Sequence, residues 1–207
     1  GHNADTKHNF GDFDLMLYPN SNKLRVRLGG GYNSTDGTGS TTSRAYSDEF
    51  ITPSRVDSGA IDLRGGLDAY LGGFNFSLSG GWRHFSDNTS YGFTFPNPGF
   101  NTTNTTVIST FDRQNPVKGN TGYGIFNIQR TFAKRLDVTA RVSYAQTNRN
   151  FRFTELITGR DNNNNIVDSD SFFIQGDSIR PEFRTDVGAT YMVTRNFRIS
   201  NSFTYRP

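Results

Sequence analysis

The stretch RLDVTARVSYA, residues 135–145, alternates apolar and polar side chains almost without interruption. One parity carries Leu136, Val138, Ala140, Val142 and Tyr144. The other parity carries Asp137, Thr139, Arg141, Ser143 and Ala145. A period of two predicts a β-strand with one apolar face and one polar face. Because the polar face includes an Asp and an Arg, the fold depends on what that face contacts.

The same alternation recurs along the chain as hairpins that are joined by long connections. The predicted hairpins are residues 11–33, 59–86, 121–148 and 182–206. Each consists of two alternating runs around a short turn, which is the pattern of a β-hairpin. The connections, rich in Asn, Thr, Ser, Asp, Gly and Pro, are residues 34–58, 87–120 and 149–181. We therefore expect an all-β chain, one unit over residues 1–207, with about eight strands and long polar loops.

The composition favours a folded β-protein and excludes several other classes. The mean hydropathy is −0.63 and only 33% of residues are hydrophobic, but 19 Phe, 9 Tyr and 22 Gly argue against disorder. The chain has no Cys, which excludes disulfides and thiolate metal sites. No apolar run reaches the roughly 18 residues of a transmembrane helix. The net charge is only +3, and the Lys and Arg residues are spread along the strands instead of forming a basic patch, so we expect no nucleic-acid partner.

The regular exchange of short turns and long connections is typical of an outer-membrane β-barrel. Such a barrel directs its apolar parity toward lipid and its polar parity toward the lumen. We therefore predict an antiparallel, up-and-down transmembrane barrel segment whose partner is the lipid bilayer of a bacterial outer membrane. The residues predicted to line the pore are Arg25, Arg27, Asp62, Arg64, Asp68, Arg83, Asp137, Arg141, Arg184, Asp186 and Arg198.

Aromatic residues gather near the ends of the predicted strands, as in the two interfacial girdles of a membrane barrel. At the loop end we expect Tyr32, Trp82, Tyr144 and Tyr205, and at the turn end Phe74, Phe132 and Phe197. Strand 121–132 is the least regular of the set. Its Arg130 shares the apolar parity, so we expect this side chain at the turn-side interface with its stem along apolar surface.

Two hairpins carry a resemblance to a known class of protein. FAKRLDVTARVSYAQTNRNFRF, residues 132–153, and YMVTRNFRISNSFTY, residues 191–205, look like hairpins of large Gram-negative outer-membrane barrels. They are similar in style to porin-like proteins and to the barrel that sheathes a multihaem cytochrome in outer-membrane electron conduits. The resemblance covers the chain as a pattern of hairpins. It implies an outer-membrane location and the passage or housing of something inside the barrel, and it assigns a role to no individual residue.

The direction of the strands leads to a further expectation. If the short turns are periplasmic, the first and last strands place both chain ends on the extracellular side, whereas barrels of this class have both ends in the periplasm. The sequence also shows no signal peptide and stops within a strand at FTYRP. We therefore expect an internal fragment of a larger, even-stranded barrel.

No motif predicts catalysis, a cofactor or a metal. DNNNNIVDSD, residues 161–170, has EF-hand-like spacing at Asp161, Asn163 and Asn165, but Ile166 replaces the required Gly, so a polar loop tip is favoured. His2, His8 and His84 are too dispersed for a metal site. The glycines of LGGGYN, residues 28–33, and of SGGWR, residues 79–83, precede no helix, so we expect them to relieve crowding or to permit strand coiling.

Three functions remain open on this sequence. The first is a charge-lined pore for ions or small polar solutes, in which Arg opposite Asp creates a transverse field. The second is a structural sheath for a periplasmic or extracellular protein partner such as a multihaem cytochrome. The third is a soluble extracellular β-protein or adhesin module. None of these functions is an enzyme, and the lumenal ion pairs could equally serve only to brace the wall.

Overall fold

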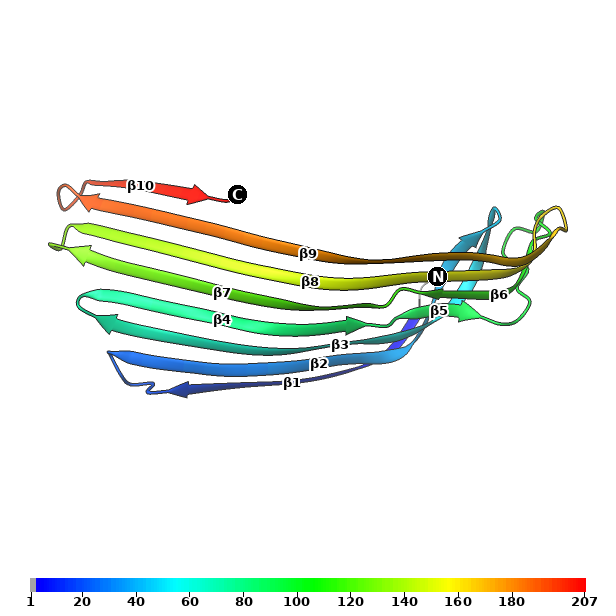
Figure 1. The fold of residues 1–207 in the computed structure, drawn as a ribbon, viewed down its shortest axis with the longest axis horizontal. Helices are drawn as coiled ribbons and strands as arrows, with labels where there is room; N and C mark the ends of the chain where they lie inside the picture. Colours follow the sequence, from blue (N-terminus) through cyan, green and yellow to red (C-terminus); the bar gives the residue numbers. More distant parts are fainter. Residues whose placement is uncertain (1–2) are drawn as a thin grey trace.

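The computed structural model describes residues 3–207, which form one antiparallel sheet and no helix (Figure 1). The strands are β1 (Asn3–Leu17), β2 (Leu24–Ala45), β3 (Asp48–Leu71), β4 (Phe74–Asp87), β5 (Ser90–Phe93), β6 (Val107–Gln114), β7 (Val117–Phe132), β8 (Leu136–Arg160), β9 (Ile166–Met192) and β10 (Arg198–Tyr205). The all-β, antiparallel class predicted from alternation is confirmed. Residues 3–207 include no helix long and apolar enough to cross a membrane.

The strands follow the chain order across the sheet, with one insertion. One end of the sheet holds the short turns that join β1 to β2, β3 to β4, β7 to β8 and β9 to β10, and we call it the turn end. There the order of strands is β1, β2, β3, β4, β7, β8, β9 and β10. At the opposite end, β4 and β7 stop and the short strands β5 and β6 continue in their place, between β3 and β8. Each strand therefore lies beside its sequence neighbour or beside the continuation of that neighbour (Figure 1).

The predicted long loops differ most from the structure. Residues 34–58 continue β2 and β3, which pair from Leu24↔Ala69 to Ala45↔Asp48 without a break. Residues 149–181 likewise extend β8 and β9. The segment 87–120 holds β5 and β6, so the described sheet has ten strands instead of about eight. Residues 34–43, STDGTGSTTS, have small polar side chains or glycine on both faces, so backbone pairing can hold this part of β2 as a strand without an apolar period.

Three of the connections between strands are tight turns: 46–47 and 72–73 have two residues each, and 133–135 has three. Gly72–Gly73, Ala133–Lys134 and Tyr46–Ser47 all have positive φ, between 47° and 83°. Two consecutive residues with positive φ form the type I′ turn, whose twist matches that of the flanking strands. At Ala133 and Lys134 this conformation occurs without glycine, and the N–H of Arg135 donates to the carbonyl of Phe132 at 3.0 Å.

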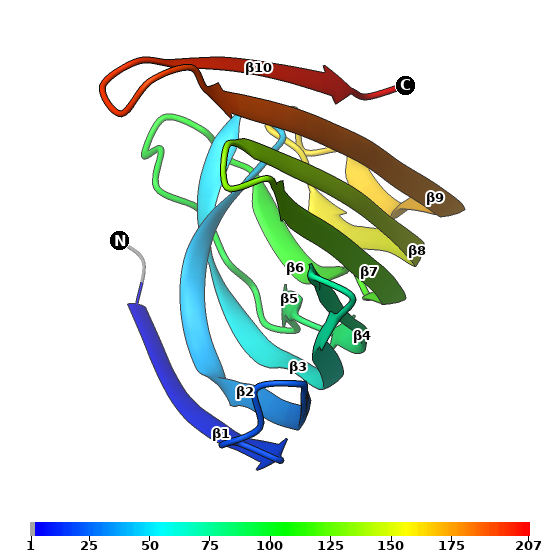
Figure 2. The same cartoon turned by 90° about the vertical axis from the view of Figure 1, so that its left-hand side faces the viewer.

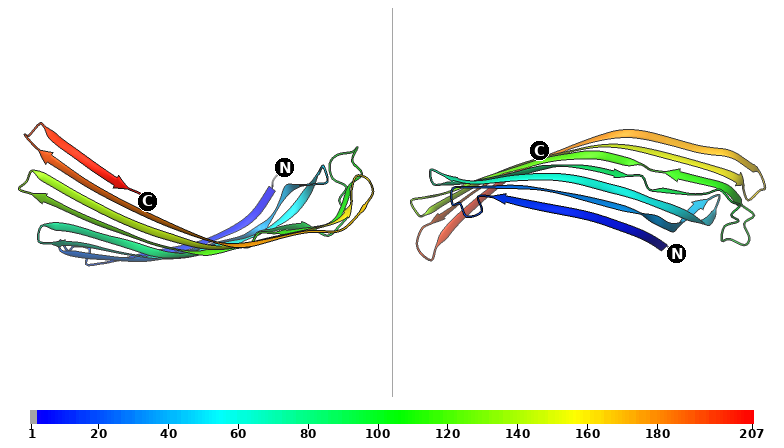
Figure 3. Two further views of the ribbon diagram at one scale, coloured as in Figure 1. Left: turned by 45° about the horizontal axis from the view of Figure 1, so that its top comes forward. Right: turned by 90° about the horizontal axis from the view of Figure 1, so that it is seen from below.

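The sheet curves into an open trough. Viewed end-on, the strands from β1 to β10 follow an arc, and the views in Figure 3 show that the strands also bend along their length (Figures 2 and 3). Within residues 3–207, β1 pairs only with β2 and β10 pairs only with β9. The arc therefore ends in two free edges, one beside β1 and one beside β10.

A small core forms at the end of the trough that holds the β2–β3 turn at 46–47, opposite the end where β3 turns into β4 and β7 turns into β8. Its buried side chains are Phe50, Phe93, Ile108, Phe111 and Ile157. The connection 94–106 lies over this end, held by Asp48, whose Oδ1 accepts the N–H groups of Phe100 and Asn101 at 3.2 and 3.0 Å. The same connection reaches the β8–β9 tip, where the N–H of Thr105 donates to Asn162 Oδ1 at 3.0 Å. These contacts join three hairpin tips at one end of the sheet.

Candidate functional site: the charged concave face

Strand pairing aligns the apolar side chains in rows on one face of the sheet. One row runs from Leu17 on β1 to Val142 on β8 and contains Leu17, Val26, Leu67, Leu78, Phe126 and Val142. These side chains pack against no other layer of the described protein, and Leu63, Leu78 and Trp82 keep 55%, 51% and 44% of their surface exposed. The apolar face is therefore large and uncovered.

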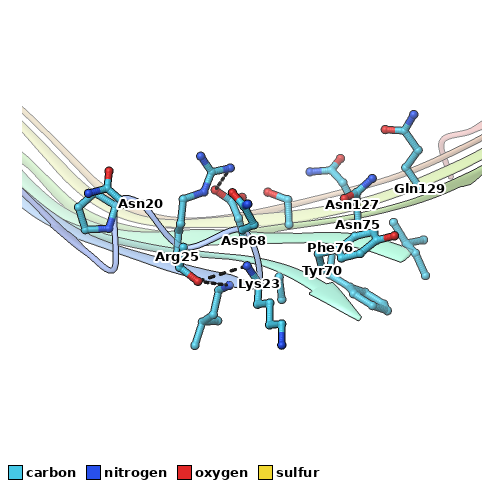
Figure 4. Close-up of a pocket in the computed structure, with 16 residues that line it drawn as sticks. Asn20, Lys23, Arg25, Asp68, Tyr70, Asn75, Phe76, Asn127 and Gln129 are labelled. Carbon is cyan, nitrogen blue, oxygen red and sulfur yellow. Dashed lines mark hydrogen bonds and ion pairs between the residues drawn. The ribbon is translucent and has the colours of Figure 1, made fainter. Parts of the chain in front are cut away.

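The residues predicted to line a pore all share the opposite face. The pairings Arg25↔Asp68, Asp62↔Arg83 and Arg141↔Asp186 link them directly across strands. Four more predicted residues lie an even number of positions from one of these on the same strand and so share its face: Arg27, Arg64, Asp137 and Arg184. Arg198 on β10 pairs with Met192, which lies six positions from Asp186 on β9, so it shares the face as well. In Figure 4, Arg25, Asp68, Asn127 and Gln129 project toward the side to which the ribbons curve. The charged face is thus the concave one, whereas its role as a pore lining remains a prediction.

Arg64 on β3 is the centre of the densest charge cluster on this face. Its Nη2 lies 2.8 Å from Asp12 Oδ1 and 3.0 Å from Asp14 Oδ2, and its Nη1 lies 3.3 Å from Asp62 Oδ2. One guanidinium therefore contacts three carboxylates, which leaves two negative charges in excess. The sequence places Asp12 and Asp14 on the polar parity of GDFDLML, but only the structure shows that they are partners of Arg64.

Two glycines on β2 make this cluster possible. Gly29 and Gly31 lie between β1 and β3, directly in the register of Asp14 with Arg64 and of Asp12 with Asp62. A Cβ on Gly29 would collide with Asp14 Oδ1 and lie 2.9 Å from Arg64 Nε, and a Cβ on Gly31 would lie 3.0 Å from Asp12 Oδ1. The side chains of β1 and β3 thus meet across a strand that has no side chain there, which confirms that these glycines relieve crowding.

Elsewhere on the concave face the charges form smaller groups. Asp68 Oδ2 forms an ion pair with Arg25 Nη2 at 3.7 Å and accepts a hydrogen bond from Arg27 Nη2. Arg184 Nε lies 2.8 Å from Asp186 Oδ2, and Asp186 Oδ1 also accepts Thr204 Oγ1 at 2.7 Å. Asp137 accepts Thr131 Oγ1 at 2.6 Å. Among the described residues, no ion pair includes Arg83, Arg141 or Arg198, so these three guanidinium groups keep their charge uncompensated by direct contact.

Arg130 lies on the apolar face near the short turns, on the parity assigned from the sequence. Its guanidinium carbon lies 4.5 Å from the ring centroid of Phe74 and 4.6 Å from that of Phe132. The two rings meet edge to face at 6.3 Å. The faces of the two rings therefore stabilise the positive charge of Arg130 at the end of the apolar rows.

The tip of the β8–β9 hairpin is a turn organised by Asp161. Its Oδ1 accepts the N–H groups of Asn163 and Asn165 at 2.9 and 2.8 Å, and its Oδ2 accepts Asn165 Nδ2 at 2.9 Å. The side-chain amide of Asn165, together with these backbone donors, holds the pKa of the Asp161 carboxyl below its ordinary value. Both carboxylate oxygens of Asp161 thus accept hydrogen bonds from residues of the turn itself, as expected for a polar loop tip.

The histidines lie apart from the charged cluster. His8 Nδ1 is 2.8 Å from Thr35 Oγ1, and His84 Nδ1 is 2.9 Å from Asn120 Oδ1 while its ring stacks on Trp82 at 6.0 Å. His2 lies outside the described residues.

The concave face also carries polar residues that the sequence analysis did not single out. They are Asn75, Asn127 and Gln129, near the short turns, and Tyr123, whose hydroxyl lies over Gly81. Their alternation with Phe76, Phe126 and Ile128 is visible in FNFSL and FNIQR, but attention to charge alone passes over neutral side chains.

Comparison with protein-family models gives no match to this chain, and comparison with curated proteins gives none. The account of the site therefore rests on its geometry.

The glycine gap on β2 predicts a large effect of a small substitution. Gly29→Val should force Asp14 and Arg64 apart and destabilise the protein by about 1–3 kcal/mol, the usual cost of overpacking. The measurement is the midpoint of urea unfolding, followed by the loss of β-sheet circular dichroism. The matched control is Gly122→Val on β7, where a Cβ meets nothing within 4 Å. Equal unfolding midpoints for the two variants would contradict the proposed role of Gly29.

Proposed function

We propose that this chain forms part of the wall of a porin-like β-barrel in a bacterial outer membrane, and that its concave face lines a pore for passive passage of ions or small polar solutes. The observation that carries the proposal is that the same strands present an uncovered apolar face on one side and a charged face on the other. This combination fits lipid outside the barrel and water inside it.

The size of the apolar face supports a lipid environment over an aqueous one. Soluble monomers rarely expose contiguous apolar patches larger than a few hundred Å². Here the apolar rows cross β1 to β8 and continue through Phe183 and Val187 on β9 to Phe203 on β10. Along β8 the alternating run 136–144 covers nine residues, within the roughly 9–11 residues that a tilted transmembrane strand needs.

The two free edges of the sheet, beside β1 and β10, would need further pairing strands in a membrane. Backbone groups at an unpaired edge cannot face lipid, because the bilayer core offers no hydrogen-bonding partners. β1 and β10 each have one neighbour within residues 3–207. The proposal therefore requires further strands beside β1 and β10, as in a larger barrel of which this sheet is one arc.

The concave face has the properties of a hydrated lumen. Its carboxylates are paired with guanidinium groups, which a dry core would tolerate only with full mutual satisfaction. The Arg64 cluster is negative, while Arg83 and Arg141 carry positive charge without an ion-pair partner in the described sheet. Opposite charge on neighbouring strands gives a transverse field that would act on any charged solute in the pore.

A lipid-facing position predicts a strong dependence of stability on charge. Val142→Arg places a cation near the middle of the apolar rows, beside Phe126 and Thr185, and should cost about 2–4 kcal/mol in a bilayer. Thr139→Arg, on the concave face of the same strand, is the matched control and should fold with little loss. The measurement is the free energy of unfolding in lipid vesicles. If both variants were tolerated alike, the lipid-facing assignment of Val142 would be wrong.

A pore predicts ion current, and its selectivity should follow the concave charges. In planar bilayers the full-length protein should conduct without a partner, and Arg83→Glu should shift the ion permeability ratio toward cations. Arg130→Gln, on the opposite face, is the matched control and should leave the ratio unchanged. A protein that inserts but carries no current until a partner is removed from its lumen would contradict the open pore and favour the sheath.

A further inference from the structure

The concave face has a second polar site, distinct from the Arg64 cluster. A pocket of about 680 Å³ lies near the short turns (Figure 4). Its lining includes Arg25, Asp68, Tyr70, Asn75, Asn127 and Gln129. Four neighbouring strands contribute: β2, β3, β4 and β7. The β1–β2 connection closes one side of the pocket with residues 19–23, so the sheet and this connection build the site together.

Three amide side chains on the β4 and β7 strands of this pocket have no hydrogen-bond partner within the described protein. Asn75 pairs in register with Gln129, and Asn127 pairs with Ser77, so the three amides occupy adjoining positions on β4 and β7. None of the hydrogen bonds among residues 3–207 uses their side-chain atoms, whereas the amides of Asn9, Asn150 and Gln146 on other strands are engaged. Each free amide offers two donors and an acceptor.

The carboxylate of Asp68 and the guanidinium group of Arg25, both in the pocket lining, neutralise each other as an ion pair. Asp68 also accepts hydrogen bonds from Arg27 and Ser77. The Lys23 side chain extends toward the opposite side of the ribbon from Arg25 (Figure 4). The groups left for a ligand are thus mainly neutral amides, with the half-exposed ring of Tyr70 at their side.

We infer that this pocket binds an uncharged, hydroxyl-rich ligand, of which a short oligosaccharide is the natural class. A sugar hydroxyl both donates and accepts, which matches the paired donor and acceptor of an amide. An aromatic ring provides the flat apolar surface that the C–H face of a pyranose can cover. The inference rests on the proposed function, because it names the class of solute that the pore would hold on its way through.

The test compares two probes of similar size on the full-length protein. Maltohexaose offers hydroxyl donors and acceptors, whereas a polyethylene glycol dimethyl ether of equal mass offers ether acceptors only. Calorimetry in detergent micelles should detect binding of maltohexaose and none of the glycol ether. In planar bilayers maltohexaose should interrupt the current for longer than the glycol ether does.

Variants then locate the binding. The double variant Asn127→Leu with Gln129→Leu should weaken maltohexaose binding at least about tenfold, because several hydrogen bonds are lost. Tyr70→Leu, which leaves the amides in place, should weaken it by a similar factor and serves if the double variant does not fold. Asn33→Leu, on the concave face of β2 outside the pocket, is the matched control and should bind as the unmodified protein does.

The outcomes separate this inference from the proposed pore. Ion current without maltohexaose binding would overturn the inference and leave the pore. Calorimetric binding that is lost in the variants, in a protein that carries no current, would support the site and overturn the pore. Binding that survives in all the variants, or equal binding of both probes, would overturn the inference.

Discussion

Backbone pairing across the sheet is the constraint on which every other feature depends. From β1 to β10 at the turn end, the ladders run without a register shift, so each side chain on one strand fixes the face of its neighbours. A slip of one residue would move a whole strand's apolar set to the charged face. The two irregularities in the pairing, at Ile108/Thr110 and Ile157/Gly159, lie at the far end, beside the small core.

That alignment gives the two faces their separate energetics. On the convex face no second layer covers the apolar rows, and Leu67 and Leu78 keep 37% and 51% of their surface exposed. On the concave face several carboxylates, such as Asp14 and Asp68, meet guanidinium groups from other strands, and Gly29 and Gly31 let side chains two strands apart come into contact. Exposed ion pairs contribute little stability individually. Their arrangement instead determines the local field, which is negative around Arg64 and positive near Arg141.

The part of the fold nearest the short turns could be predicted from the sequence, because alternation there is strong. In β8, Leu136 to Tyr144 define one face without ambiguity, and their pairing partners on β7 and β9 keep it. The part beyond could not be predicted. Residues 34–43 have small polar side chains or glycine on both faces, so their strand structure depends on pairing with β3 and leaves no period in the sequence.

The candidate site divides in the same way. Charged residues on the polar parity, such as Asp62 and Arg141, can be placed on a face from alternation alone. Which carboxylates share Arg64 depends on the lateral register of three strands, which no local pattern encodes. The amides of the second pocket also depend on register, since Asn75 and Gln129 are distant in sequence and adjacent only through the β4–β7 pairing. Phe50 and Ile157 join one core for the same reason.

The most direct measurement of the central claim uses the absence of cysteine in the sequence. Single cysteines introduced in turn at residues 136–145 of the membrane-reconstituted protein can be probed with a water-soluble thiol reagent and with a fluorophore quenched by brominated lipid. The account predicts a period of two, with lipid quenching at 136, 138, 140, 142 and 144 and aqueous labelling at the positions between them. Equal aqueous labelling at both parities would contradict it.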